Sequence, residues 1–167
     1  GAIAIALLHD LTGWTGVAVD RSPRAMALAG RNANRNGVAG RLHLIEADFR
    51  DPDSASAIGA EGPFDLVVSN PPYIRSGDIP GLMPEVRDHD PREALDGGPD
   101  GLDALRDLAR GLPRWLRPGG LAAVEIGADQ ADDSLKLMGA VLEDARVLRD
   151  LAGRPRILIG TRLGGEA

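Results

Sequence analysis

Residues 64–73 read FDLVVSNPPY, and in this stretch a short hydrophobic run passes directly into two prolines. The run at 64–69 combines valine with phenylalanine and leucine, a composition typical of a strand. Pro71 and Pro72 fix φ and lack a backbone N–H, so the strand cannot continue and the carbonyls beyond it stay free to accept hydrogen bonds. Residues 70–73 are therefore expected directly after a strand, in a position open to a ligand.

Two further strands are predicted upstream, and each of them ends in an aspartate. They are 16–20 (GVAVD), which ends at Asp20, and 41–48 (RLHLIEAD), which ends at Asp48. Ser22 and Pro23 form a favourable N-cap and first turn for a helix that runs towards Asn36. An apolar, alanine-rich helix is predicted over residues 2–11.

Downstream of the prolines the sequence changes to a long segment at 71–101 that contains six prolines. Because proline interrupts helices, we expect this segment to be a long functional loop without packed elements. The elements predicted after it are a helix over 102–116, a turn at 117–120, a strand over 121–127, a helix over 131–142 and a terminal β-hairpin of 145–151 and 156–162.

Strands that alternate with helices at this spacing predict an α/β fold with a doubly wound, mostly parallel, Rossmann-like sheet and a C-terminal antiparallel hairpin. A chain of 167 residues fits one domain better than two, so we expect a single domain over 1–167. Ligands of such sheets bind at the carboxyl ends of the strands. Asp20, Asp48 and residues 70–73 each follow a predicted strand, and the topology predicts that they lie at one edge.

Composition excludes several classes of function. A net charge of −6 leaves no basic surface for nucleic acid as the main partner, so we expect no direct nucleic-acid contact. The absence of cysteine excludes thiolate nucleophiles, disulfides and cysteine-ligated zinc, and the three histidines are scattered, so we expect no metal site. With no leader peptide and no apolar run of membrane-spanning length, a cytoplasmic protein without a membrane partner is expected.

The run at 70–73 suits chemistry on an amide or amino nitrogen. An amide nitrogen is a poor nucleophile, so a site that alkylates it must orient the nitrogen. The side-chain oxygen of Asn70 and the carbonyl of Pro71 could each accept one N–H of a planar group, while Tyr73 stacks against it. A nitrogen held in this way would face a sulfonium methyl for in-line displacement, with orientation supplying most of the acceleration. An ordinary strand-terminating turn is the alternative for an isolated match of this kind.

The two strand-end acids suit a nucleoside. Asp20 is placed to hold the vicinal hydroxyls of a ribose, because a carboxylate can accept with both oxygens. Asp48 could accept from an adenine amino group, with Phe49 packing beside the ring. Taken singly, Asp20 is better explained as a helix N-terminal acid and Asp48 as a solvated loop acid. Their placement together with residues 70–73 favours the binding site.

The blocks GAIAIAL, AVD, EADF, NPPY, ALDGGPDGLD and EIG occur in this order, and on them the chain resembles the release factor glutamine N5-methyltransferase family over essentially its whole length. The block NPPY is shared with amino-group methyltransferases of DNA and RNA, so it indicates a reaction type. The family-specific signal is ALDGGPDGL at 94–102. The resemblance implies a class I enzyme that transfers a methyl group from S-adenosylmethionine to a glutamine side chain of a peptide chain release factor.

The resemblance also implies roles for individual residues. The family grips its substrate glutamine with the NPPY run, and it binds the ribose and the adenine of its cofactor with the acids after the second and third strands. The implied substrate-binding residues are Asn70, Pro71, Pro72 and Tyr73, of which Asn70, Pro71 and Tyr73 are the catalytic ones. The implied cofactor-binding residues are Gly1, Asp20, Asp48, Phe49 and Asn70.

The front of the chain departs from the family pattern. Family members carry an N-terminal helical domain that helps to recognise the release factor, then a strand and a glycine-rich loop, and Gly1 resembles the last glycine of that loop. We therefore expect an N-terminally truncated chain that lacks the first central strand, between 16–20 and 64–69. We expect such a chain to have little activity of its own and to bind the cofactor with less than full affinity.

Three other readings remain open on the sequence. An adenine methyltransferase acting on DNA or RNA would share the same run and acids, but it should also carry a basic patch or a recognition domain. A nicotinamide-dependent oxidoreductase would explain Asp20 but not residues 70–73. A non-catalytic fragment would at most bind a partner through its proline-rich loop, and binding of S-adenosylmethionine by the folded chain would exclude it.

Overall fold

A computed structural model describes residues 1–164 and divides the chain into two compact units, Gly1–Glu61 and Gly62–Ala167. Each unit has a sheet of its own, and the strands of one sheet do not pair with those of the other in the described part of the chain. The single catalytic domain expected for the whole chain stays a prediction.

Unit 1 is built around two parallel strands. Its elements are α1 (Ala2–Asp10), β1 (Gly16–Asp20), α2 (Pro23–Arg35), the 3₁₀ turn η1 (Ala39–Arg41), β2 (Leu42–Glu46) and α3 (Pro52–Ala60). The prediction for β1 is confirmed at both ends, whereas β2 is shorter than the predicted 41–48. The predicted start of α2 is also confirmed, because the Ser22 hydroxyl accepts from the Ala25 amide at 3.2 Å and Pro23 occupies the first turn.

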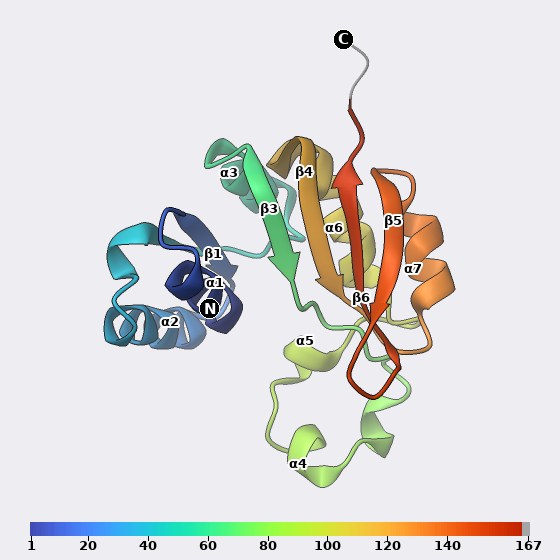
Figure 1. Ribbon diagram of the computed structural model, residues 1–167. Coiled ribbons are helices and arrows are strands. Elements are labelled where there is room, and N and C mark those ends of the chain that lie inside the picture. Colours follow the sequence, from blue (N-terminus) through green and yellow to red (C-terminus); the bar gives the residue numbers. More distant parts are fainter. Residues whose placement is uncertain (165–167) are drawn as a thin grey trace. The chain divides into compact units, whose positions relative to one another are not determined.

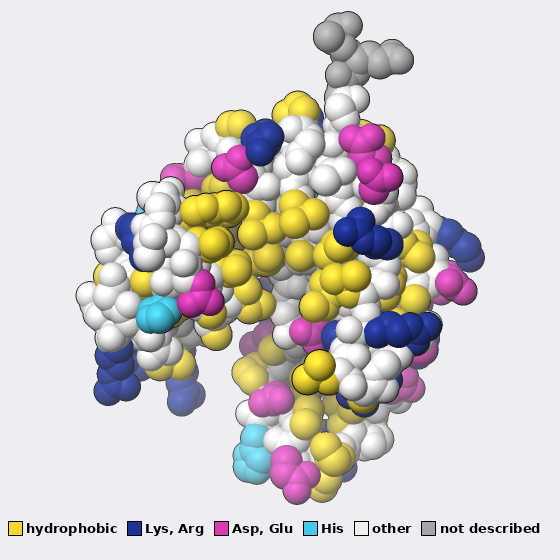
Figure 2. Space-filling model, in the orientation of Figure 1, with side chains coloured by type: hydrophobic (Ala, Val, Ile, Leu, Met, Phe, Trp, Pro, Cys, Tyr) yellow, Lys and Arg dark blue, Asp and Glu magenta, His cyan; other side chains and the backbone are white. Residues whose placement is uncertain are grey.

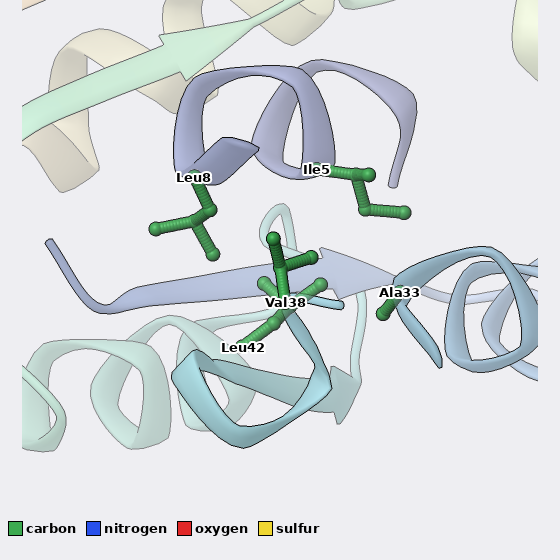
Figure 3. Close-up of a cluster of buried hydrophobic side chains, with 5 residues drawn as sticks. All are labelled: Ile5, Leu8, Ala33, Val38 and Leu42. Carbon is green, nitrogen blue, oxygen red and sulfur yellow. The ribbon is translucent and has the colours of Figure 1, made fainter. Parts of the chain in front are cut away.

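A cluster of buried aliphatic side chains holds unit 1 together. Leu8 points from α1 toward Val38 and Leu42, while Ile5 and Ala33 extend the cluster towards α2 (Figure 3). Each of the five is less than 9% exposed. Burying aliphatic side chains of this size contributes roughly 1.5–3 kcal/mol each for valine, leucine and isoleucine, so this cluster is the main source of stability of the unit.

The helix α3 was not predicted from the sequence. Its start carries a recognisable signal, since the Asp51 side chain accepts from the Ser54 amide at 2.8 Å and Pro52 occupies the first turn. The body of the helix is made of small residues, and Ile58 is its one buried residue. A helix with so little apolar surface shows no hydrophobic period, which is the reason that periodicity did not predict it.

Unit 2 contains a mixed sheet with the strand order β3-β4-β6-β5. Its strands are β3 (Phe64–Ser69), β4 (Leu116–Glu125), β5 (Leu142–Arg149) and β6 (Pro155–Arg162). The pair β3 and β4 is parallel, and β6 runs antiparallel to both β4 and β5. The predicted strand at 64–69 and the predicted terminal hairpin are confirmed, and the hairpin places its second strand, β6, beside β4.

Two helices, α6 (Asp103–Trp115) and α7 (Ala131–Met138), pack against each other and against this sheet, behind it in Figure 1. Ala122, Val124 and Leu158 are fully buried on the helix side. The alternate residues of the same strands point to the other face, because successive side chains of a strand alternate. That face is apolar and partly exposed, with Leu121 and Ile157 both more than a third exposed, and Figure 2 shows hydrophobic side chains gathered over it.

Two predictions in unit 2 were wrong in detail. The predicted turn at 117–120 lies within β4 as a bulge, because Phe64 pairs with Leu116 and Leu66 then pairs with Leu121. The predicted helix 131–142 ends at Met138, and Leu142 already begins β5. Local spacing could not show where the helix ends, because an apolar residue at 142 fits both a helix and a strand. Leu142 belongs to a strand because it pairs with β6.

The long segment after β3 also contains more structure than predicted. It holds the 3₁₀ turn η2 (Ile79–Gly81) and the short helices α4 (Pro84–Arg87) and α5 (Arg92–Leu95). Pro80 and Pro84 lie in the first turns of their elements and Pro91 is an N-cap, positions in which the missing N–H costs nothing. The prolines therefore begin short helices here and do not exclude them.

The described residues show neither a membrane span nor a metal cluster. Among residues 1–164, no helix combines the length and the hydropathy that crossing a bilayer requires. Within the same residues, no group of three or more histidine, aspartate or glutamate side chains is arranged to hold a metal ion.

Ser134, in the middle of α7, provides a test of the packing of unit 2. Its side chain is fully buried, and its hydroxyl has no hydrogen-bond partner among the described residues. A buried hydroxyl without a partner costs about 1–3 kcal/mol. We therefore expect Ser134→Ala to raise the free energy of unfolding by about 1 kcal/mol in urea titrations.

Ser56→Ala is the matched control, because the Ser56 hydroxyl on α3 is exposed and donates to the Pro52 carbonyl at 3.0 Å. Both changes improve helix propensity by a similar amount, so the difference between them isolates the buried hydroxyl. A loss of stability in Ser134→Ala would contradict the structure at this position.

Candidate functional site

The run Asn70–Tyr73 lies between the end of β3 and a short segment at Ile74 that pairs with residues 95–97. Asn70 is exposed and Pro71 is buried, whereas Tyr73 is half-buried. Directly after the run, the Ile74 amide donates to the Leu95 carbonyl at 3.0 Å, and the Ile74 carbonyl accepts from the Gly97 amide at 2.8 Å. The backbone of the run is thus held at both ends.

The two acceptors predicted for a substrate nitrogen are not used within the protein. Among residues 1–164, no protein group hydrogen-bonds the side-chain amide of Asn70 or the carbonyl of Pro71. Asn70 is exposed, so its amide is open to a ligand, while the buried proline ring beside it limits the motion of the backbone. The binding of one planar group by both acceptors stays a prediction.

The Tyr73 hydroxyl belongs to a cluster of three polar side chains. It donates to Glu125 at the end of β4 at 3.0 Å, and Arg156 of β6 donates to it at 3.2 Å. Burial raises the pKa of Tyr73, the Glu125 carboxylate raises it further, and Arg156 offsets part of this rise. The phenol is therefore neutral at physiological pH and donates its hydrogen bond to Glu125. Its two hydrogen-bond partners hold the ring in place, and the hydroxyl is not available as a base.

Glu125 and Arg156 were not predicted as site residues. Glu125 falls inside the strand predicted over 121–127, and its carboxylate accepts from the hydroxyl of a proposed site residue. The parallel register of β3 and β4 pairs Ser69 with Val124, so Glu125, the last residue of β4, lies at the same level as Asn70, which follows β3 directly. The signal that could have identified Glu125 is its place near the carboxyl end of the strand predicted over 121–127, since ligands of such sheets bind at the carboxyl ends of the strands. Arg156 has no comparable signal, since its position depends on β6 lying beside β4.

The raised pKa of Tyr73 can be measured directly, because it is the only tyrosine of the chain. We expect the tyrosinate absorbance of the folded chain to titrate with a midpoint above 10.0. Glu125→Gln should lower this midpoint and Arg156→Gln should raise it, since the two side chains shift the pKa in opposite directions.

The sign of the linked stability change follows from the same shift. A pKa that is higher in the folded than in the unfolded chain gives a stabilisation that is complete below about pH 10 and is lost as the pH rises through the folded-state pKa. The chain in denaturant is the control and should titrate near pH 10 in all variants. Equal midpoints in the folded wild type and both variants would contradict the cluster.

The family signature at 94–102 contains Leu95 and Gly97, the backbone partners of Ile74. The Ser76 hydroxyl donates to Asp96 at 2.5 Å, and the Gly98 amide donates to the same carboxylate at 3.0 Å. These two bonds, with an ion pair to Arg92, lower the pKa of Asp96. Asp96 therefore stays ionised and closes the loop that contains α4 and α5. The sequence marked this block as informative but assigned it no structural role.

The two predicted cofactor acids lie in unit 1, after adjacent parallel strands. Asp20 ends β1 opposite Glu46 of β2, and the Ala47 amide donates to the Asp20 carbonyl at 3.1 Å. One side-chain oxygen of Asp20 accepts from the Ser22 amide at 2.9 Å. In the described part of the chain the other oxygen has no partner, so it is available to a ligand.

Asp48 has less capacity to accept further hydrogen bonds. One of its oxygens accepts from the backbone amide and the Nε of Arg50, and the other accepts from Arg50 at 3.1 Å and from Arg21 at 3.4 Å. The bonds from Arg50 lower the pKa of Asp48. A carboxylate has about four lone-pair sites, so an adenine amino group would need to displace a partner, and the exposed Arg21 at 3.4 Å is the weakest one.

The remaining predicted cofactor residues also lie in unit 1. Phe49 is half-buried beside Asp48. Gly1 is the N-cap of α1, and a Cβ on it would lie 2.8 Å from the Ala29 Cβ, so glycine permits the close approach of α1 and α2. The acids of unit 1 and the Asn70–Tyr73 run of unit 2 are thus each placed within their own unit. Their meeting at a single edge stays a prediction.

Comparison with known proteins places the chain among methyltransferases. A family model described as methyltransferase small domain matches residues 1–82. A release factor glutamine methyltransferase from Gloeobacter violaceus is 44% identical over 161 residues, which are 95% of this chain and 54% of that protein. Another, from Moorella thermoacetica, is 44% identical over 165 residues, which are 97% of this chain and 56% of that protein. The chain spans about half the length of the curated relatives it matches.

Solved structures agree on the fold. An RNA methyltransferase from Salinibacter ruber, in complex with S-adenosyl-L-homocysteine, has a TM-score of 0.58 and an identity of 18%, with 100% of this chain and 77% of that chain covered. At this identity the likeness concerns the fold alone. The predicted α/β methyltransferase fold is confirmed, with a sheet that is mixed and not mostly parallel in unit 2. Over 95–97% of its own length the chain is similar, at 44% identity, to release factor glutamine methyltransferases, as the resemblance predicted.

Proposed function

We propose that this chain is the catalytic part of an S-adenosylmethionine-dependent enzyme that methylates the side-chain amide of a glutamine in a peptide chain release factor. The observation that carries the proposal is the run Asn70–Tyr73, which offers two unused acceptors directly after β3 in a chain 44% identical to release factor glutamine methyltransferases. The proposed partner is therefore a protein, and the absence of cysteine suits a reducing cytoplasm as the compartment.

The donors and acceptors of unit 1 fit the nucleoside part of the cofactor. Asp20 has one oxygen free for the ribose hydroxyls, and its carboxylate is held in place by the Ser22 amide. Asp48 would reach the adenine amino group by exchanging Arg21, with Phe49 beside the ring. When bound, S-adenosylmethionine supplies a methyl group on a positively charged sulfur, which is a strong electrophile for a weakly nucleophilic nitrogen.

The residues of unit 2 would act on the glutamine amide. Asn70 and Pro71 accept its two N–H bonds, which fixes the plane of the amide and draws electron density onto the nitrogen. Tyr73, whose hydroxyl is held by Glu125, offers its ring to the planar group. One amide proton leaves for solvent when the nitrogen is methylated. Because the Tyr73 hydroxyl keeps its proton and donates a hydrogen bond to Glu125, we assign the ring an orienting role and no proton transfer.

The proposal is tested by incubating the complete gene product that contains this chain with S-adenosylmethionine and a recombinant bacterial release factor. We expect mass spectrometry to find a gain of one methyl group on a glutamine of the release factor. Methylation of adenine in DNA or RNA with an unmodified release factor would favour the nucleic-acid reading and overturn this proposal. A folded protein that does not bind S-adenosylhomocysteine in isothermal titration would overturn both readings.

A further inference from the structure

The buried side chain of Gln130, at the N-cap of α7, joins three segments of unit 2 that are far apart in sequence. It is 3% exposed. Its Nε2 donates to the Tyr73 carbonyl at 3.0 Å and to the Gly101 carbonyl at 3.2 Å, and its Oε1 accepts from the Gly127 amide at 2.9 Å. Both N–H donors and the acceptor of the amide are therefore used.

The backbone around Gln130 is shaped to its amide group. A Cβ on Gly101, which has φ +78°, would lie 2.5 Å from the Gln130 Nε2 and 2.5 Å from the Tyr73 carbonyl oxygen. A Cβ on Gly127 would lie 2.8 Å from the Gln130 Oε1. The close contacts on both sides require glycine, and glycine alone leaves room for the planar amide between them.

No other common side chain would satisfy these three backbone groups. Glutamate would turn a carboxylate oxygen towards two carbonyl oxygens, which repel it. Leucine would leave two carbonyls and one amide buried without partners, and each such group is costly. The site is therefore specific for the two donors and one acceptor that a glutamine amide carries.

We propose that Gln130 is a positioning residue for methyl transfer, which holds the backbone of the Asn70–Tyr73 run in its working geometry by joining Tyr73 to Gly101 and to Gly127, just after β4. This inference rests on the proposed function. Tyr73 is then held at two points, with Glu125 binding its hydroxyl and Gln130 binding its carbonyl. Because Asn70 and Pro71 lie between β3 and this anchor, loss of the carbonyl bond changes the direction of both acceptors.

Gln130→Glu in the complete gene product is the test, because it keeps the size of the side chain and removes both donors. We expect kcat for methylation of the release factor to fall about 10- to 100-fold, as for a misplaced reacting group. The dissociation constant for S-adenosylhomocysteine should stay within about 2-fold of wild type, since the acids proposed for its nucleoside belong to unit 1.

The pH profile separates positioning from a general loss of structure. A buried carboxyl group that faces two carbonyls has a raised pKa, and its protonated form regains one donor. We therefore expect the kcat of Gln130→Glu, relative to wild type, to recover as the pH falls from about 8 towards about 5.5, above the ordinary glutamate pKa of about 4.3. A purely structural defect gives no such recovery.

Ser134→Ala is the matched control, because Ser134 lies one turn further along α7, is equally buried and contacts no part of the run by a hydrogen bond among the described residues. It should keep wild-type kcat. If Gln130→Glu does not fold, Gln130→Asn takes its place, since it keeps the amide and shortens its reach by one methylene. A folded variant with wild-type kcat at all pH values overturns the inference, whereas a wild type that does not methylate glutamine overturns the proposed function.

Discussion

Asn70→Ala in the complete gene product is expected to reduce methyl transfer about 10²- to 10³-fold, which corresponds to roughly 3–4 kcal/mol of transition-state stabilisation. The physical reason is that Asn70 supplies one of two acceptors that orient the glutamine amide, and orientation is the main contribution proposed for this site. Asn70 is exposed and has no hydrogen bond within the described protein, so its removal should not disturb the fold.

The measurement combines initial rates of methyl transfer with isothermal titration of S-adenosylhomocysteine. Turnover should fall while the dissociation constant for S-adenosylhomocysteine changes by less than about 3-fold, because the loss is confined to substrate orientation. Asn34→Ala is the control, since Asn34 is an exposed asparagine of α2 whose side chain, among the described residues, hydrogen-bonds only the Gly30 carbonyl of its own helix. Near-wild-type turnover in Asn70→Ala would refute the amide clamp.

Asp20→Ala is expected to weaken binding of S-adenosylhomocysteine about 10- to 100-fold. A hydrogen bond to a charged group contributes about 1.5–3 kcal/mol, and Asp20 has one side-chain oxygen available for the ribose. The change also removes the acceptor for the Ser22 amide, so the N-terminus of α2 loses some stability.

Two variants separate these effects. Asp20→Asn keeps an oxygen for the Ser22 amide but loses the charge, so it should fold like wild type and bind S-adenosylhomocysteine with an intermediate affinity. Asp10→Ala removes an exposed acid whose only hydrogen bond in the described residues is to His9, and it should leave affinity unchanged. An unchanged dissociation constant in Asp20→Ala would show that the strand-end acid does not bind the cofactor.

Much of the fold follows from local chemistry that the sequence displays. Ser22 and Pro23 begin α2 through a side-chain cap and a fixed φ, which depend on neighbours three residues away. The strand at 64–69 ends where proline removes the backbone donor. The positions of Asp20 and Asn70 at the carboxyl ends of strands could also be predicted, because each of them comes at the end of a short hydrophobic run.

The missed features depend on contacts between distant segments. The strand state of Leu142 comes from pairing with Arg162, and the position of Arg156 beside Tyr73 requires β6 to lie next to β4. No local period or propensity contains this information, because strand order is set by the packing of the whole sheet.

Gln130 shows most clearly the difference between features that local sequence predicts and features that depend on tertiary contacts. The sequence alone predicted the resemblance to a methyltransferase family, the acids after the strands and the run Asn70–Tyr73, since each is a short block whose chemistry is local. Only the tertiary structure placed the Gln130 amide between the carbonyls of Tyr73 and Gly101, which are 57 and 29 residues away. A glutamine after a strand is an ordinary surface residue in the sequence, and it becomes a buried anchor because folding brings three backbone segments to its one amide group.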